Sequence, residues 1–309
     1  MAIIEVEGLR KEYRGWRKGR TLAVDGLDLV VPEGGVFAFL GPNGAGKTTT
    51  IRCLLGLVRP TGGRCRLLGA DTPKDLATVI RRVGSIVETP TFFPRFSGRL
   101  NLELQGRLHG VGRKAAADVL ERVGLADRAD HLVKTYSLGM RQRLGIAAAL
   151  LNDPEVLILD EPANGLDPAG IKEVRELLRR LGDQGRTIFV SSHILTEVRH
   201  TADRVAILSR GKCVASGPVG EVLMAGRSAG LIVRVDDMAG GLQALRSAGI
   251  PASADDHAIR VMLPPEEAAT VTRTLADRGL YLTELRPDEV DLETVFLELT
   301  RETPKEASP

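Results

Sequence analysis

Hydrophobic residues in this chain gather in short runs of strand length, which are separated by longer segments with helical spacing. Uninterrupted apolar runs at 36–40, 156–159 and 187–190 are typical of strands buried on both faces of a parallel sheet. Residues 3–7 alternate between apolar and acidic side chains, which indicates a strand with one exposed face. The pattern therefore predicts an α/β fold around a mixed sheet.

The same pattern divides the chain. We expect a first domain over residues 1–223, with a helical subdomain at about 84–150, and a small, polar linker at 224–230. Strand and helix periods restart after the linker, so an accessory α+β domain is predicted for 231–300 and a disordered tail for 301–309. Its expected elements are strands at 231–235, 258–263 and 281–285 and helices at 242–247, 266–277 and 292–299.

Composition narrows the function classes. A net charge of +2 gives no electrostatic case for a nucleic-acid partner. The three cysteines, Cys53, Cys65 and Cys213, form no close pair, which argues against a disulfide framework or a zinc ribbon. The chain shows neither a secretory leader pattern nor a run of eighteen apolar residues, and we expect a cytoplasmic protein.

A glycine-rich segment directly follows the apolar run at 36–40 and precedes a helix-like stretch. Its spacing fits a P-loop, in which backbone N–H groups converge on a polyphosphate at a helix N-terminus. We therefore expect ATP or another nucleoside triphosphate here, with Lys47 at the β- and γ-phosphates and the Thr48 hydroxyl on Mg²⁺. The predicted binding residues are Gly41, Pro42, Asn43, Gly44, Ala45, Gly46, Lys47, Thr48 and Thr49.

Two further strands end in candidate catalytic groups. The run at 156–159 leads into Asp160 and Glu161, of which the first is expected to hold Mg²⁺ and the second to polarise the attacking water as general base. The alternative for Glu161 is a capping or surface role. His193 follows the run at 187–190, at the sheet edge where ligands bind, and is predicted to contact the γ-phosphate, although a lone histidine is more often structural.

Residues 136–143, Tyr-Ser-Leu-Gly-Met-Arg-Gln-Arg, complete the pattern. The first 220 residues or so resemble the ATP-binding cassette (ABC) ATPases, because five motifs occur in the order typical of that family. These are the phosphate loop, the segment 136–143, the Asp-Glu pair, Asn-Gly-Leu-Asp at 164–167 and the histidine. The resemblance implies a P-loop cassette in which Ser137 and Gly139 meet the ATP of a second copy. Because the chain carries one of each element, a head-to-tail homodimer is expected.

Two positions depart from the common family pattern. Leu138 replaces a glycine and excludes the left-handed conformations that glycine would reach. Glu88 stands where many relatives have a glutamine that touches Mg²⁺ and the attacking water, so we expect Glu88 there, with an effect on rate that has no predictable sign. Both features resemble the subgroup that serves bacterial drug, antibiotic-peptide and lantibiotic efflux.

Two aromatic residues are candidates for stacking on adenine. Tyr13 follows the apolar alternation at 3–7, at about the place where the family has its stacking ring, and is favoured over Trp16.

A loop with three phenylalanines, at residues 89–98, begins just after Glu88. Exposed rings would be costly, so we expect either a docking surface for another protein or, alternatively, local core. The family resemblance implies that such a surface takes a helix of a separate permease. The chain is thus interpreted as the ATPase subunit of an exporter at the inner face of the membrane. A soluble non-transport ATPase and an import ATPase are the alternatives, and the accessory domain could regulate, support a dimer or only stabilise.

Overall fold

The computed structural model describes the chain except for residues 1, 16–18, 89, 225–229, 256 and 289–309. Its described residues divide into two compact units, the first ending at Val219 and the second beginning at Gly220. This division falls inside helix α7 (Val219–Met224), slightly before the predicted end of the first domain at residue 223. Within the described part, no helix is long and apolar enough to cross a membrane.

The first unit is built on a six-stranded sheet with strand order β10-β9-β3-β8-β7-β6. All of its strands run parallel except β10, which pairs antiparallel with β9 at one edge. The carboxyl ends of β3, β7 and β8 therefore meet at one edge of the sheet, where open α/β sheets bind ligands. The strands are β10 (Lys212–Pro218), β9 (Arg204–Ser209), β3 (Gly35–Leu40), β8 (Thr187–Ser192), β7 (Val156–Asp160) and β6 (Val83–Ile86).

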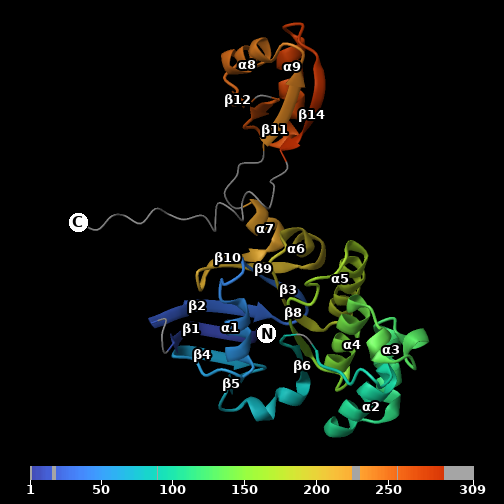
Figure 1. Cartoon of the computed structure of the whole chain (residues 1–309). Helices are drawn as coiled ribbons and strands as arrows, with labels where there is room; N and C mark the ends of the chain where they lie inside the picture. Colours follow the sequence, from blue (N-terminus) through green and yellow to red (C-terminus); the bar gives the residue numbers. More distant parts are fainter. Residues whose placement is uncertain (1, 16–18, 89, 225–229, 256, 289–309) are drawn as a thin grey trace. The chain divides into compact units, whose positions relative to one another are not determined.

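A second, antiparallel sheet has strand order β2-β1-β4-β5. Helix α1 (Lys47–Leu54) joins the two sheets, because its Ile51 belongs to the same buried cluster as Leu27 of the antiparallel sheet and Phe39 of the central one (Figure 1). The mixed α/β architecture predicted from the apolar runs is thereby confirmed. The strands of this sheet are β1 (Ala2–Gly15), β2 (Gly19–Pro32), β4 (Gly62–Leu67) and β5 (Ala70–Thr72).

A group of three helices lies beside the central sheet, coloured green in Figure 1. Residues 84–86, the start of the predicted helical range, instead belong to the edge strand β6 (Val83–Ile86), which pairs with β7. Gly84 allows that packing, since a Cβ there would lie 2.2 Å from the carbonyl oxygen of Ala149. The three helices are α2 (Gly98–His109), α3 (Arg113–Arg122) and α4 (Leu138–Leu150).

Helices α5 (Pro168–Asp183) and α6 (Leu195–Thr201) lie close to β3 and β8 (Figure 1). Helix α5 begins where Asp167 accepts a hydrogen bond from the Gly170 amide at 2.9 Å, with proline in the first turn. Short 3₁₀ turns complete the described connections, at Leu76–Thr78, Ile80–Arg82, Ala126–Arg128, Val133–Thr135 and Pro265–Glu267.

The second unit has the element order β-α-β-β-α-β and the strand order β12-β13-β11-β14, which is the ferredoxin-like split β-α-β arrangement. The strand β12 is only three residues long and was not predicted. Most of the predicted linker, the predicted helix at 292–299 and the tail lie outside the described residues. The elements are β11 (Gly230–Val235), α8 (Met238–Ser247), β12 (Ala252–Ala254), β13 (Ile259–Val261), α9 (Ala268–Ala276) and β14 (Leu282–Asp288).

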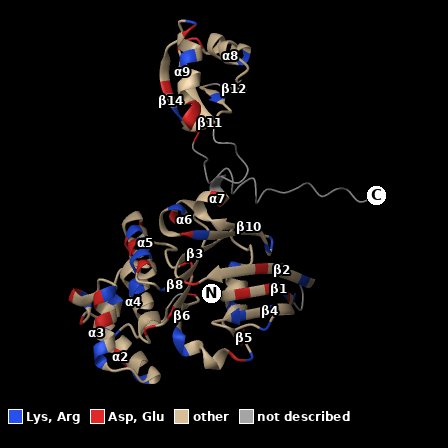
Figure 2. Ribbon diagram, turned by 180° about the vertical axis from the view of Figure 1, so that it is seen from behind, with Lys and Arg blue, Asp and Glu red and all other residues tan. Residues whose placement is uncertain are grey.

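Basic and acidic residues are interspersed along the helices α2 to α5 (Figure 2). Several are paired there, for example Arg99 with Asp130 at 2.8 Å and Arg143 with Glu173 at 3.2 Å. This mixing agrees with the small net charge.

Candidate functional site

The glycine-rich loop connects β3 to α1 and closes tightly against the rest of the unit. Gly46, the residue before α1, has a φ of 109°, and a Cβ there would lie 2.5 Å from the carbonyl oxygen of Ala23. A Cβ on Gly41 would lie 2.7 Å from the carbonyl oxygen of Leu208. The loop therefore requires glycine at these two positions, and it presents the first amides of α1 at the ligand-binding edge.

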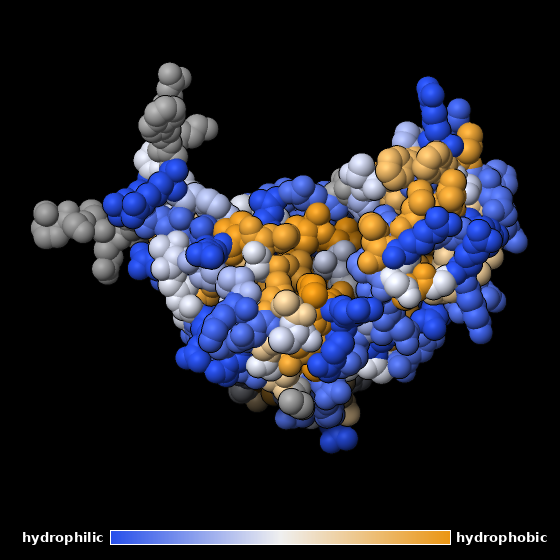
Figure 3. Space-filling view, turned by 90° about the horizontal axis from the view of Figure 1, so that it is seen from below, coloured by the Kyte–Doolittle hydropathy of each residue, from blue (hydrophilic) through white to orange (hydrophobic). Residues whose placement is uncertain are grey.

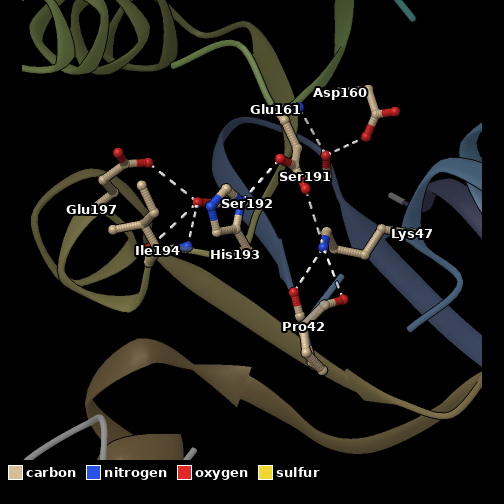
Figure 4. A network of polar contacts seen from close by, with 10 residues as sticks. Pro42, Lys47, Asp160, Glu161, Ser191, Ser192, His193, Ile194 and Glu197 are labelled. Atoms are coloured by element: carbon tan, nitrogen blue, oxygen red, sulfur yellow. Dashed lines mark hydrogen bonds and ion pairs between the residues drawn. The ribbon is translucent and has the colours of Figure 1, made fainter. Parts of the chain in front are cut away.

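Lys47 is buried at the start of α1, with its ammonium turned back into the loop (Figure 4). The Nζ atom donates to the carbonyl oxygens of Gly41 at 2.7 Å and Pro42 at 3.2 Å, and it lies 3.2 Å from Oε1 of Glu161. A positive charge enclosed by a loop with converging amides suits a polyphosphate. Thr48 is half-buried in the first turn of the same helix.

Asp160 and Glu161 are held by one serine of the neighbouring strand. The Ser191 hydroxyl donates to Oδ1 of Asp160 at 2.5 Å and accepts from the Glu161 amide at 2.9 Å. Ser191 lies opposite Asp160 in the parallel β7–β8 pair and is fully buried. Ser191 was not among the predicted site residues, because its place opposite Asp160 depends on the register of β7 and β8.

His193 lies in the turn after β8, and its ring reaches Glu161. The Nδ1 atom of His193 is 2.9 Å from Oε2 of Glu161 (Figure 4). Glu161 itself has a φ of 47°, a left-handed conformation that is uncommon outside glycine and frequent at functional sites. Lys47, Glu161 and His193 thus form a continuous chain of contacts, which we call the Lys47–His193 network.

Glu88 lies outside the Lys47–His193 network. Its carboxylate pairs with the guanidinium of Arg52, on the outer part of α1, and its side chain is 68% exposed. The backbone of Glu88 is left-handed, with a φ of 77°. Its expected place beside Mg²⁺ therefore stays a prediction, which would require the carboxylate to leave Arg52.

No three His, Cys, Asp or Glu side chains of the described residues form a metal-binding group. A Mg²⁺ site at this edge needs no such group. Magnesium is typically held by one or two protein oxygens together with waters and phosphate oxygens. Asp160, placed at the end of β7, and Thr48, in the first turn of α1, offer the carboxylate and hydroxyl oxygens that this ion prefers.

Helix α4 begins within residues 136–143, the segment predicted to meet the ATP of a second copy. Ser137 is its N-cap and accepts a hydrogen bond from the Met140 amide at 3.2 Å, while Leu138 is already the first helical residue. A right-handed conformation at 138 needs no glycine, so the substitution costs the backbone nothing. Next to Gly139 there is room for a ligand, because a Cβ there would meet no atom closer than 3.9 Å. Among the described residues of one chain, Ser137 makes no hydrogen bond or ion pair with the Lys47–His193 network.

The adenine side of the site is only partly described. Tyr13 lies on β1, pairs with Thr21 of β2, and has the Lys11 ammonium 4.9 Å from its ring centroid. Trp16, its rival, lies outside the described residues. The choice between the two rings stays open.

The phenylalanine loop presents two of its rings to solvent. Phe93 is 62% and Phe96 38% exposed, and their ring centroids lie 5.2 Å apart. Buried Asn101 braces the loop by accepting from the Phe93 amide at 2.8 Å and donating to the carbonyl oxygens of Phe93 and Ser97. For Phe93 and Phe96 the local-core alternative is therefore wrong. Phe92 is half-buried and lines an adjacent groove of about 490 Å³ together with Glu88.

Comparison with known proteins shows to which family this chain is related. Residues 24–164 match the ABC transporter family model. The chain is 40% identical to an uncharacterised ABC transporter ATP-binding protein, YhcH of Bacillus subtilis, over 98% of both chains. It is 38% identical to the bacitracin transport ATP-binding protein BcrA of Enterococcus faecalis, over 96% of both. Identity to the daunorubicin/doxorubicin resistance ATP-binding protein DrrA of Streptomyces peucetius is also 38%, over 96% of this chain and 92% of that one.

A solved structure of an ATP-binding cassette has a similar fold. The ATP-binding cassette MJ0796, in a dimeric post-hydrolysis state bound to ADP and phosphate, superposes with a TM-score of 0.62 at 26% identity. The superposition covers 70% of this chain and 98% of that one.

Proposed function

This chain belongs to the ABC transporter ATPases, binds and hydrolyses ATP as they do, and we propose that it powers the export of a drug or antibiotic peptide through a separate permease. The contact chain from Lys47 through Glu161 to His193 carries the ATPase part of this proposal. The export part is supported by relatives across nearly the whole chain whose names specify bacitracin transport and daunorubicin resistance. Import and non-transport roles are less well supported.

We assign the roles in hydrolysis as follows. The Lys47 ammonium would exchange its two loop carbonyls for β- and γ-phosphate oxygens. Asp160 and Thr48 would hold Mg²⁺, which offsets phosphate charge when bound. Glu161 would accept a proton from the attacking water, and His193 would orient Glu161 and contact the γ-phosphate.

The second ATP-binding surface requires another copy of the chain. We assign Ser137, Gly139 and the N-terminus of α4 to an anion-binding surface, and among the described residues Ser137 makes no hydrogen bond to the phosphate loop of its own chain. A head-to-tail homodimer would supply each phosphate loop with the partner's α4 start. The dimeric state of the structural neighbour MJ0796 supports this arrangement.

The permease contact is assigned to the exposed rings Phe93 and Phe96 and the groove beside them. Apolar side chains gather around a hollow on this face of the first unit (Figure 3). A helix of a membrane partner would bury both rings, each worth about 2 kcal/mol. The chain would then work at the inner face of the cell membrane, held there by the permease.

A co-purification experiment tests the permease contact. The double variant Phe93→Ser/Phe96→Ser should fold and bind ATP normally, because both rings are already exposed, but should recover the permease at least ~10-fold less efficiently from detergent. Val30→Ser, at a 61% exposed position on β2, is the matched control. Equal recovery of the complex with the double variant and the control would place the docking site elsewhere.

The export function is tested in cells. Expression of this chain with the membrane protein encoded beside its gene should raise resistance to bacitracin or an anthracycline. The same pair carrying Glu161→Gln should not. Resistance that is unaffected by Glu161→Gln, or a neighbourhood without a membrane protein, would favour a non-transport role.

A further inference from the structure

Glu197 is a carboxylate of α6 that points toward the catalytic edge of the sheet (Figure 4). Its Oε2 atom lies 3.2 Å from the Ser192 hydroxyl, which donates to it. Its Oε1 atom is buried and has no hydrogen-bond partner among the described residues. Burial raises the pKa of this carboxyl above its ordinary value. Glu197 is half-buried, and a buried carboxylate oxygen without a partner is costly, so its presence here asks for an explanation.

Ser192 connects Glu197 to the turn that carries His193. The Ser192 hydroxyl accepts a hydrogen bond from the Ile194 amide at 3.0 Å, so it closes the turn around His193 while it donates to Glu197. Its neighbour Ser191 holds the Asp160–Glu161 pair from the other side of the strand. Ser191 thus supports Glu161 and Ser192 supports the turn of His193, so both partners of the Glu161–His193 contact are held by the end of β8.

A small cavity joins the same groups. It has a volume of about 30 Å³ and is lined by Glu161, Ser192, His193, Glu197 and Arg175, with apolar side chains of α5 and α6 around them. Most of the cavity wall is apolar, and Glu197 and His193 both lie along it. The contact that joins Glu197 to the His193 turn is the one through Ser192.

We propose that Glu197 is a positioning residue for His193: through Ser192, it fixes the turn that presents the imidazole to Glu161. The inference rests on the proposed role of His193 in hydrolysis. Loss of the anchor should leave ATP binding intact, because the phosphate loop and Lys47 are not involved. Hydrolysis should suffer, because small displacements of an orienting group lower turnover by up to about 10²-fold.

Glu197→Ala tests the proposal by its effect on kcat. We expect kcat to fall ~10-fold, with ATP affinity within about threefold of wild type. Glu197→Gln retains an oxygen that accepts from Ser192, so it should restore kcat to within about threefold. Glu176→Ala, an exposed carboxylate of α5, is the matched control. Equal losses of kcat and ATP affinity in Glu197→Ala, or no rescue by Glu197→Gln, would overturn the positioning role.

Two further measurements separate positioning from stabilisation. In the His193→Ala background, Glu197→Ala should lower kcat no further, whereas an independent effect would be additive. Imidazole nitrogen NMR should show the His193 signals shifted in Glu197→Ala and in Ser192→Ala, which remains usable if the first variant folds poorly. Unshifted His193 signals in both variants would refute the inference alone. Wild-type hydrolysis by His193→Ala would instead remove the proposed catalytic role of His193.

Discussion

Ser191→Ala removes the hydroxyl that binds Asp160 and the Glu161 amide together. The side chain is fully buried, and both of its hydrogen bonds involve the residues placed in hydrolysis. A hydrogen bond to a charged group contributes about 1.5–3 kcal/mol, and an orphaned amide costs about 1 kcal/mol more. Because Asp160 lies at the carboxyl edge of the sheet, where water can replace the lost donor, we expect a loss near the low end, about 2.5 kcal/mol.

Calorimetry and steady-state hydrolysis measure the two consequences. For a unit of this size, about 2.5 kcal/mol corresponds to a decrease in Tm of roughly 5–10 °C. Hydrolysis should fall by ~10-fold or more at saturating ATP, because both carboxylates lose their common support. Thr187→Val is the matched control: this buried threonine, at the opposite end of β8, accepts from the Gly34 amide at 2.8 Å.

The control should lose comparable stability without losing kcat. If Ser191→Ala is destabilised as much as Thr187→Val yet hydrolyses ATP at the wild-type rate, the serine only stabilises the sheet. The reasoning that one hydroxyl orients both carboxylates would then be refuted.

Three other predictions concern separate regions. Glu88→Gln should leave ATP affinity within a few-fold but alter turnover in a Mg²⁺ titration. Arg52→Ala should alter turnover only while Glu88 is present, and additive effects of the two substitutions would refute a shared role of Glu88 and Arg52 in turnover. Asn101→Ala should destabilise the first unit by about 2 kcal/mol and speed hydrogen exchange at the Phe93 amide, since three backbone bonds are lost. Burial raises the pKa of Cys65 to about 12, so only ~1 thiol in 10⁴ is ionised at pH 8 and native protein should resist iodoacetamide there; rapid native alkylation would contradict this burial.

The sequence predicted the parts of the site that local pattern determines. A glycine loop between an apolar run and a helix start has few other uses, and strands ending in Asp160 and His193 must bring those residues to one edge when they are parallel. The structure adds the contacts that join these residues, from Lys47 to Glu161 and from Glu161 to His193.

What could not be predicted depends on register or on surface pairing. Ser191 supports Asp160 only because β7 and β8 pair residue against residue in that register, a long-range fact that apolar spacing does not encode. The pairing of Glu88 with Arg52 joins two side chains far apart in sequence. Leu138 was judged by the glycine it replaces, but its helical backbone makes that comparison irrelevant.

Hydrolysis by Glu161→Gln tests the account most directly, in a single-turnover assay with purified protein and Mg²⁺-ATP. We predict that the rate falls by at least ~10²-fold with ATP affinity within a few-fold, and that an ATP-bound dimer accumulates, because the amide keeps the shape of the side chain without its basicity. Glu155→Gln, an exposed carboxylate just before β7, should hydrolyse normally. A near-wild-type rate for Glu161→Gln would contradict the assignment of Glu161 as the base.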